Sequence, residues 1–172
     1  MYTYRNILAS DYEAIERFED ERDAIDSISA ECLDEMFSFG ENNFATYHGL
    51  IAEHDGELVG YVIYFELRQH PGKKCIIRCF VAPEHRREGV GSQLIQRCEP
   101  TQSGHRVSIE VGLDDYAEAS FLRKNGYTVI EIIDAEYNEE GEIEMDGFMI
   151  LVNEKKKKKV MELVQRLAWR AN

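Results

Sequence analysis

The 172-residue chain lacks long apolar runs, and its basic residues are outnumbered by acidic ones. No apolar run approaches the roughly 20 residues that a membrane-spanning helix needs, and residues 1–5 hold no apolar core typical of a signal peptide. The formal net charge of −13 repels nucleic-acid backbones. We therefore expect a cytoplasmic protein that binds neither a membrane nor nucleic acid. The same charge favours cationic partners such as amines, and it serves equally well for solubility alone.

The cysteines and histidines show no metal-ligand spacing. No two cysteines form a C-x-x-C pair, and we interpret Cys32, Cys75, Cys79 and Cys98 as buried, reduced thiols. This usage favours a reducing compartment. The histidines are not spaced as ligands either, and we predict no metal. An acidic turn at Asn138–Glu142 either attracts a cationic acceptor or is simply solvated.

Alternating and helical apolar patterns predict the element order β-α-α-β-β-β-α-β-α-β-β, followed by a C-terminal helix. The strands are expected at residues 2–7, 47–53, 58–67, 76–81, 107–111, 127–133 and 143–152. Residues 1–152 form the expected domain, and residues 153–172 hold a lysine run and an amphipathic helix that docks on the same subunit or builds a homodimer. The strand–helix–strand unit from Ile76 to Val111 predicts a parallel pair in a mixed α/β architecture.

Short-range signals predict several element boundaries. Ser10 with Glu13, and Asp115 with Glu118, have the spacing of capping boxes at the starts of two expected helices. Asp55-Gly56 lies between two expected strands and is a strong hairpin signal, because both residues tolerate positive φ.

The segment Arg86–Ser92 follows the apolar run Ile76–Val81, which predicts a buried strand, and it opens an amphipathic helix. A strand, a turn and a helix start in this order aim free N–H groups at an anion. The two glycines let a ligand approach the main chain, and the two arginines add positive charge. We expect a phosphate-bearing cofactor rather than a solvated basic turn. A dinucleotide fingerprint fails because Leu94 occupies its third glycine position, and no Walker-type lysine is present.

The motif Arg86-Arg87-Glu88-Gly89-Val90-Gly91 resembles the Arg/Gln-x-x-Gly-x-Gly/Ala signature of the GNAT superfamily of acetyl-CoA-dependent N-acetyltransferases. Residues 81–84 resemble the usual approach to that signature, and Ala119–Tyr127 is similar to a family helix that ends in Lys-x-Gly-Phe/Tyr. The resemblance covers about residues 1–152. It implies a GNAT-like α/β (α+β) domain with a mixed, mostly antiparallel sheet, a splayed parallel pair and helices on both faces, to which the C-terminal helix is an addition.

The resemblance also implies acetyl-CoA as the co-substrate. The diphosphate of CoA would lie on the N–H groups of residues 87–91, and the pantetheine arm would pair with the main chain of Phe80 and Val81. Asp115 stands where the family often has an asparagine that contacts this arm. The implied cofactor-binding residues are Phe80, Val81, Arg86, Arg87, Glu88, Gly89, Val90, Gly91, Ser92 and Asp115.

The catalytic residues depart from the family pattern. Many family members place a tyrosine, which protonates the leaving thiolate, at the position of Leu122, and leucine cannot donate a proton. Tyr116 and Tyr127 are the candidate replacements. Glu110 is a candidate base, directly or through water, and an ordinary solvated strand carboxylate is the alternative. Cys75 lies where some members carry a glutamate.

From these residues and the resemblance we expect an enzyme that moves an acetyl group from acetyl-CoA to a primary amine by direct attack in a ternary complex. The acceptor is either a small molecule or a protein amino group. Leu122 leaves open a non-catalytic acyl-CoA-binding regulatory module, and the width of the thioester pocket leaves open another acyl-CoA as donor.

Overall fold

The computed structural model describes residues 1–21, 28–38, 45–99, 105–137 and 143–153. They belong to two compact units, Met1–Glu99 and Pro100–Asn172, which are described in turn. The acidic turn at Asn138–Glu142, the lysine run and the C-terminal helix that the sequence predicts lie outside the described residues. None of the described helices is long and apolar enough to cross a membrane.

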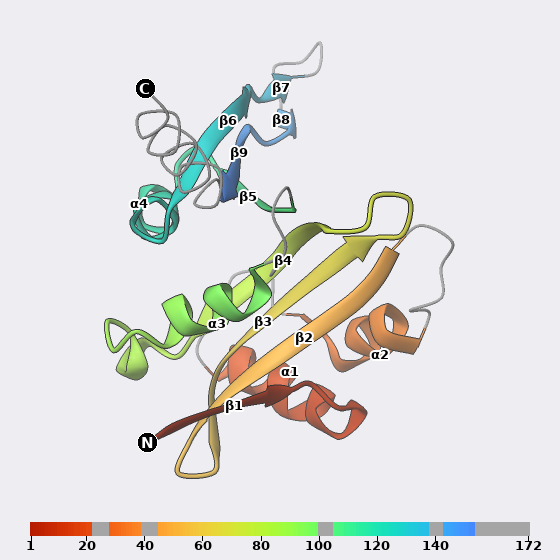
Figure 1. Ribbon diagram of the computed structural model, residues 1–172, viewed down its shortest axis with the longest axis vertical. Helices are drawn as coiled ribbons and strands as arrows, with labels where there is room; N and C mark the ends of the chain where they lie inside the picture. Colours follow the sequence, from red (N-terminus) through yellow and green to blue (C-terminus); the bar gives the residue numbers. More distant parts are fainter. Residues whose placement is uncertain (22–27, 39–44, 100–104, 138–142, 154–172) are drawn as a thin grey trace, which may run out of the picture. The chain divides into compact units, whose positions relative to one another are not determined.

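The first unit is built on four antiparallel strands that follow one another in space as they do in sequence (Figure 1). These are β1 (Tyr2–Asn6), β2 (Ala45–His54), β3 (Glu57–Leu67) and β4 (Lys73–Val81). All four coincide with predicted strands, and no end differs by more than three residues; the differences arise because fraying strand ends carry little apolar pattern.

The β2–β3 connection is the predicted tight hairpin. Asp55 has φ of 53° and Gly56 has φ of 87°, so both central residues are left-handed, as a type I′ turn requires. A Cβ on Gly56 would meet no atom within 4 Å. Backbone conformation, rather than crowding, therefore explains the glycine.

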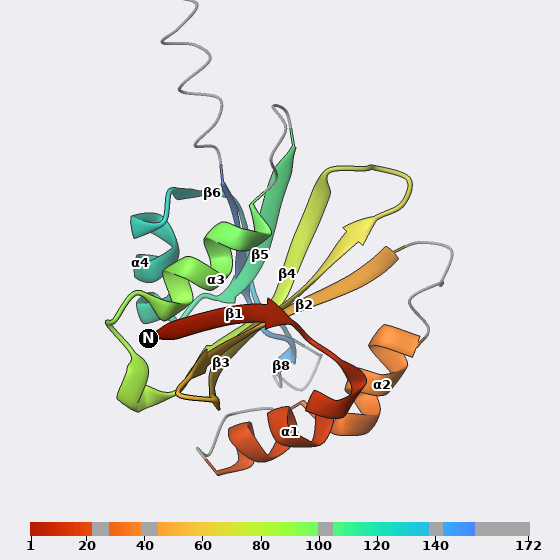
Figure 2. The same cartoon turned by 60° about the horizontal axis from the view of Figure 1, so that its bottom comes forward.

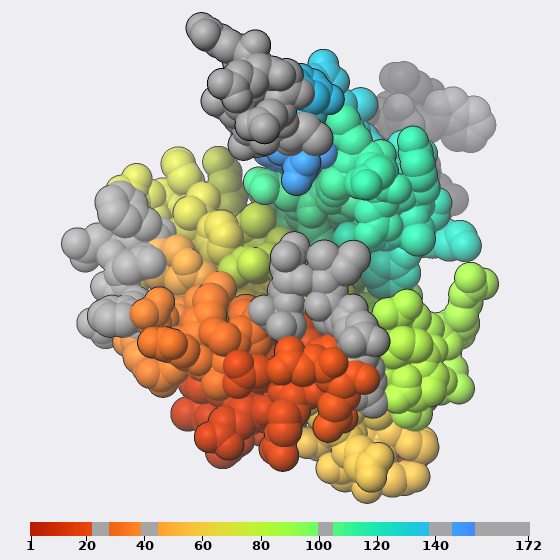
Figure 3. Space-filling view, turned by 180° about the vertical axis from the view of Figure 1, so that it is seen from behind, coloured from red at the N-terminus to blue at the C-terminus, as the bar shows by residue number. Residues whose placement is uncertain are grey.

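Three helices cover the two faces of this sheet. They are α1 (Tyr12–Asp20), α2 (Ala30–Ser38) and α3 (Val90–Cys98). Figure 2 shows α3 on one face and α1 and α2 on the other, and Figure 3 shows α1 and α2 in front of the strands when the molecule is seen from behind. The face under α1 and α2 holds an apolar core made of Ile7, Tyr12, Ile15, Phe18, Leu33, Ile51, Tyr61, Ile63 and Ala82. Burying each large aliphatic side chain contributes roughly 1.5–3 kcal/mol.

The predicted capping box at the start of α1 is wrong. A 3-10 turn, η1 (Ala9–Asp11), precedes the helix, and the carboxylate of Asp11 accepts from the Leu8 N–H at 2.7 Å. The guanidinium of Arg5 binds the same carboxylate at 2.7 Å. This ion pair with β1 holds Asp11 and lowers the pKa of its carboxyl, and the helix begins one residue later than the spacing of Ser10 and Glu13 predicts.

The second unit holds a three-stranded antiparallel arrangement in the order β5, β9, β6. The strands are β5 (Arg106–Gly112), β6 (Tyr127–Ile133) and β9 (Phe148–Asn153), and α4 (Tyr116–Lys124) connects β5 to β6. Asp115 caps α4 by accepting from the Glu118 N–H at 2.9 Å, so the second capping box is confirmed on its Asp115 side. The parallel pair predicted between residues 76 and 111 would join strands of different units and stays a prediction.

The single strand predicted at residues 143–152 is wrong. It divides into β8 (Ile143–Met145), which pairs with β7 (Glu136–Tyr137), and β9. The break falls at Gly147, where a Cβ would lie 2.7 Å from the Leu113 side chain and 2.9 Å from the Ala135 nitrogen. The chain can pass these neighbours only because glycine has no side chain.

Candidate active site

The turn between β4 and α3 has an unusual backbone. After a 3-10 turn, η2 (Pro83–His85), Arg87 takes φ of 68° and Gly89 takes φ of 88°. Left-handed geometry at Arg87 costs a non-glycine residue about 1–2 kcal/mol, and such strain gathers at functional sites. A Cβ on Gly89 would meet no atom within 4 Å, so the space beside the helix start is open.

This turn ends in the free N–H groups of a helix N-terminus. Gln93 donates to the Gly89 carbonyl at 2.9 Å, which is the first hydrogen bond of the α3 ladder. The N–H groups of Val90, Gly91 and Ser92 precede that bond, and helix geometry offers them no acceptor within the helix. The positive end of the helix dipole acts at the same place, so the turn and helix start can bind an anion.

The two arginines differ in how firmly they are held. Arg86 donates through Nε to the Val81 carbonyl at 3.0 Å, and its guanidinium carbon lies 5.9 Å from the Phe80 ring centroid. Its charge is therefore fixed over the end of β4. Arg87 is exposed beside the open space at Gly89. Both cations favour a phosphate at this turn.

One carboxylate also lies in the turn. Glu88 is half-exposed, and its Oε2 accepts a hydrogen bond from the Tyr2 hydroxyl of β1. That bond is the main reason why the pKa of Glu88 is lowered and the pKa of Tyr2 is raised to about 12. The same tyrosine oxygen lies 3.0 Å from Nδ1 of His85.

The end of β4 that leads into the turn is less buried than its apolar sequence predicts. In the pairing with β3, Ile63 faces Arg78 and Tyr64 faces Ile76, so Ile77 is an extra residue in a bulge. Its side chain is 40% exposed, whereas Ile76 is buried. The strand predicted at residues 76–81 is confirmed, but its burial is confirmed only at Ile76: residues 78–81 are half-buried, and Ile77 is exposed because a bulge re-aims its side chain.

The candidate residues of the second unit lie in different environments. Tyr116 is the first residue of α4 and is 76% exposed, whereas Tyr127 begins β6 and is 2% exposed. Glu110 is exposed on β5, opposite Ile150 of β9. Leu122 is fully buried in the apolar side of α4. The predicted cofactor residues at 80–92 are thus grouped in the first unit, and the catalytic candidates are spread over three elements of the second.

Sequence reasoning missed a buried ionic cluster under α1. Glu19 is fully buried, and its Oε1 accepts from the Tyr61 hydroxyl at 2.5 Å and from Arg78 Nε at 2.7 Å, while Oε2 accepts from the Ile28 N–H at 2.6 Å. Burial and the bond to Glu19 raise the pKa of Tyr61. Glu19 stands four residues after Ile15, on the apolar side of α1. A glutamate at that position is the signal from which the sequence could have predicted a buried carboxylate.

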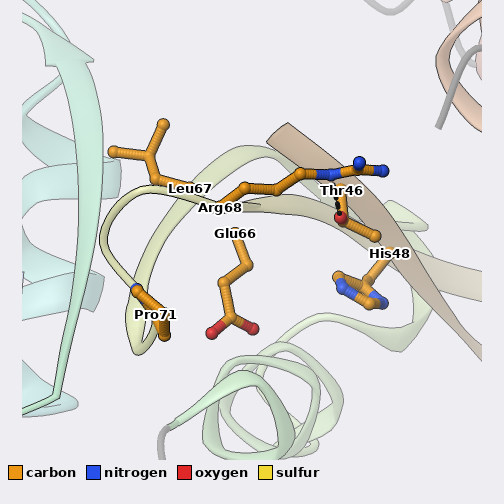
Figure 4. A pocket seen from close by; sticks show the side chains of 6 residues that line it. All are labelled: Thr46, His48, Glu66, Leu67, Arg68 and Pro71. Carbon is orange, nitrogen blue, oxygen red and sulfur yellow. Dashed lines mark hydrogen bonds between the residues drawn. The ribbon is translucent and has the colours of Figure 1, made fainter. Parts of the chain in front are cut away.

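A cavity of about 240 Å³ opens at the other end of β3, away from the turn (Figure 4). Arg68 Nε donates to Thr46 Oγ1 at 3.3 Å, and Glu66 accepts from the Gly72 N–H at 2.7 Å. Burial, followed by the charge of Lys74, lowers the pKa of His48 in this cavity. The described residues contain no group of three or more His, Cys, Asp or Glu side chains that could hold a metal.

A family model for the acetyltransferase (GNAT) family matches residues 2–127. The chain belongs to this family. The GNAT resemblance inferred from the turn motif is thereby confirmed, and the protein is an acyltransferase of a family that uses acetyl-CoA. A comparison with curated proteins found no match.

Solved GNAT structures are similar to this chain in fold. The diaminobutyrate acetyltransferase EctA from Paenibacillus lautus, in complex with L-2,4-diaminobutyric acid and coenzyme A, is 20% identical with a TM-score of 0.67, covering 89% of this chain and 95% of that chain. A chimera of the spermidine N-acetyltransferase SpeG from Vibrio cholerae and hSSAT is 16% identical, with a TM-score of 0.66 and coverage of 88% and 93%. A ribosomal-protein-alanine N-acetyltransferase from Brucella melitensis is 14% identical, with a TM-score of 0.64 and coverage of 87% and 98%. These likenesses confirm the GNAT-like α/β fold class.

Proposed function

We propose that this GNAT protein transfers the acetyl group of acetyl-CoA to a primary amine by direct attack within a ternary complex. The observation that carries the proposal is the turn before α3. Its open left-handed Gly89, its two arginines and the free N–H groups at the helix start together form an anion site. A diphosphate is the anion that acetyl-CoA would bring.

The chain offers suitable contacts for this cofactor. The N–H groups of residues 87–91 would bind the diphosphate, with the Ser92 hydroxyl as a further donor. The half-buried main chain of Phe80 and Val81 would accompany the pantetheine arm as an added strand does. Asp115 already uses Oδ1 to cap α4, and its other carboxylate oxygen would be the one available to this arm.

In the proposed reaction the neutral amine attacks the thioester carbonyl, a C–N bond forms and the C–S bond breaks. The attacking nitrogen loses one proton, and the leaving thiolate gains one. We propose Tyr116 rather than Tyr127 as the donor to the thiolate, because Tyr116 is exposed, whereas Tyr127 is buried. Glu110, exposed on β5, is the candidate base through water.

The class of acceptor follows from charge and from the relatives. Structurally similar proteins are named for the acetylation of diaminobutyrate, spermidine and a ribosomal-protein alanine, each of which presents an amine. The net charge of −13 attracts a cationic amine to this chain. We therefore propose a small polyamine-like or amino-acid acceptor, or a protein amino group, within a reducing cytoplasmic compartment.

The buried Leu122 favours one alternative, a CoA-binding module without catalysis. Both candidates predict binding, so isothermal titration with CoA and thermal unfolding with acetyl-CoA come first. At a ligand concentration 100 times Kd, binding stabilises by about 2.7 kcal/mol. Thiol release from acetyl-CoA and from longer acyl-CoA donors over a panel of amines then separates an enzyme from a module.

A Gly89→Val variant tests the location of the diphosphate. A Cβ at Gly89 would meet no atom within 4 Å, so the fold should survive with a backbone strain of about 1–2 kcal/mol from the positive φ, while CoA binding is lost. Gly56→Val, also at positive φ and also with no atom within 4 Å, is the matched control and should keep CoA binding. Unchanged CoA affinity in Gly89→Val would refute the proposed diphosphate site.

A further inference from the structure

Side chains from three segments meet at Glu88 in the turn. The Tyr2 hydroxyl of β1 donates to Oε2 of Glu88, and His85 Nδ1 lies 3.0 Å from the tyrosine oxygen and 3.7 Å from the same Oε2. From the β2–β3 hairpin, the His54 ring lies 4.9 Å from the Tyr2 ring and 5.4 Å from the His85 ring. Asp55 in turn lies 3.5 Å from His54 Nδ1. Glu88 is therefore tied to β1 and not left to move freely in solvent.

This restraint matters because Glu88 carries the wrong charge for its position. It stands between Arg87 and Gly89, within the main chain that would bind a diphosphate. A glutamate side chain has several rotatable bonds, and a free carboxylate could turn toward the bound anion and repel it. A carboxylate held at β1 keeps its charge at one fixed place.

We propose that Tyr2 is a positioning residue for the cofactor: its hydroxyl holds the Glu88 carboxylate at β1 and keeps the main-chain N–H groups of residues 87–91 clear for a diphosphate. This inference rests on the proposed function. Because the hydroxyl donates its single proton to Glu88, its oxygen can take part in the contact with His85 only as an acceptor, which requires the tautomer with the proton on Nδ1; the three groups then form one hydrogen-bonded chain. The lowered pKa of Glu88 agrees with this, because the tyrosine bond favours the ionised carboxylate.

The test is a double-mutant cycle measured by isothermal titration with CoA. Tyr2→Phe should weaken CoA binding about fivefold, the effect of one mobile charge several ångströms from a diphosphate in water. Glu88→Gln should bind CoA at least as tightly as the wild type, because it removes the repelling charge and keeps the main-chain N–H. In the Tyr2→Phe/Glu88→Gln double variant, the tyrosine substitution should have no further effect.

Tyr4→Phe is the matched control. Tyr4 lies two residues along the same strand, where it packs against Arg97 at 4.0 Å from the ring centroid and not against the turn. Tyr4→Phe also removes a tyrosine hydroxyl, and this variant should leave CoA affinity unchanged. Raising the salt concentration should reduce the effect of Tyr2→Phe, because screening weakens an exposed charge repulsion, whereas a packing defect would persist.

The outcomes separate the inference from the proposed function. Wild-type protein that fails to bind CoA would overturn the proposed function and this inference with it. Wild-type protein that binds CoA, together with a Tyr2→Phe variant that binds equally well, would overturn the inference alone. The inference alone is also overturned if Tyr2→Phe weakens CoA binding as much in the Glu88→Gln background as in the wild type. Rescue by Glu88→Gln supports the inference even if Tyr2→Phe lowers stability, since the glutamine restores no packing at Tyr2.

Discussion

Replacing Glu19 with alanine tests the buried ionic cluster beneath α1. The carboxylate accepts hydrogen bonds from the Tyr61 hydroxyl, Arg78 Nε and the Ile28 N–H, at 2.5, 2.7 and 2.6 Å. Alanine would leave a fully buried hydroxyl and a main-chain N–H without this acceptor. It would also remove the charge of Glu19 from beside the Arg78 guanidinium, whose side chain is only 24% exposed.

The size of the effect follows from these three donors. A buried donor without its acceptor costs about 1–3 kcal/mol, and removing one member of a buried ion pair costs about 3–5 kcal/mol. The two figures describe overlapping losses and are not added. Because Arg78 keeps some contact with solvent, we expect the free energy of unfolding to fall by about 4 kcal/mol. The corresponding fall in Tm is roughly 8–16 °C for a chain of this size.

Urea unfolding followed by far-UV circular dichroism measures this loss. Glu13→Ala, on the exposed side of the same helix, is the control and should change stability by about 0.5 kcal/mol or less. Replacing the three side chains together, as Glu19→Leu/Tyr61→Phe/Arg78→Met, should recover much of the loss, because the hydroxyl and the guanidinium that Glu19 bound are then gone and only the Ile28 N–H still lacks this acceptor. A loss below about 1 kcal/mol for Glu19→Ala would refute the reasoning.

Three further predictions concern the rest of the chain. Gly147→Ala should destabilise the second unit by about 1–3 kcal/mol in urea unfolding, since its Cβ would lie 2.7 Å from the Leu113 side chain. Burial and Lys74 lower the pKa of His48 below 6.5, so the folded protein binds fewer protons than the unfolded chain and loses stability as pH falls below about 6.5. His48→Gln should therefore reduce the difference between the free energies of unfolding measured above and below that pH. Tyr116→Phe should lower kcat for thiol release about 100-fold with little change in KM for acetyl-CoA, if this hydroxyl protonates the thiolate.

Each of these has a clear contrary result. A Gly147→Ala variant as stable as the wild type would mean that the neighbouring chain yields without cost. An unchanged pH dependence in His48→Gln would assign the acid sensitivity to other groups. Full activity in Tyr116→Phe would exclude this tyrosine as the acid and leave Tyr127 as the remaining candidate.

The features that sequence reasoning predicted correctly depend on residues a few positions apart. The hairpin at Asp55-Gly56 follows from the positive φ that both residues accept, and the cap at Asp115 bonds to an N–H three residues away. The predicted turn and helix start after β4 are a local feature as well, because Gly89 directly precedes the first residue of α3. Such signals need no knowledge of the rest of the fold.

The wrong predictions involve neighbours that are distant along the chain. The first capping box fails because Arg5 of the first strand holds Asp11, and the last long strand breaks where Gly147 meets Leu113. The exposure of Ile77 comes from the register that β4 takes against β3. None of these contacts leaves a local pattern.

Membership of the GNAT family could thus be inferred from the turn motif at residues 86–91 and the element order around it, because such motifs are local. The ion pair of Glu19 with Arg78 spans 59 positions, and the contact of Tyr2 with Glu88 spans 86. Folding alone brings such residues together, since a sequence pattern describes one element at a time, while burial and charge pairing depend on which elements become neighbours.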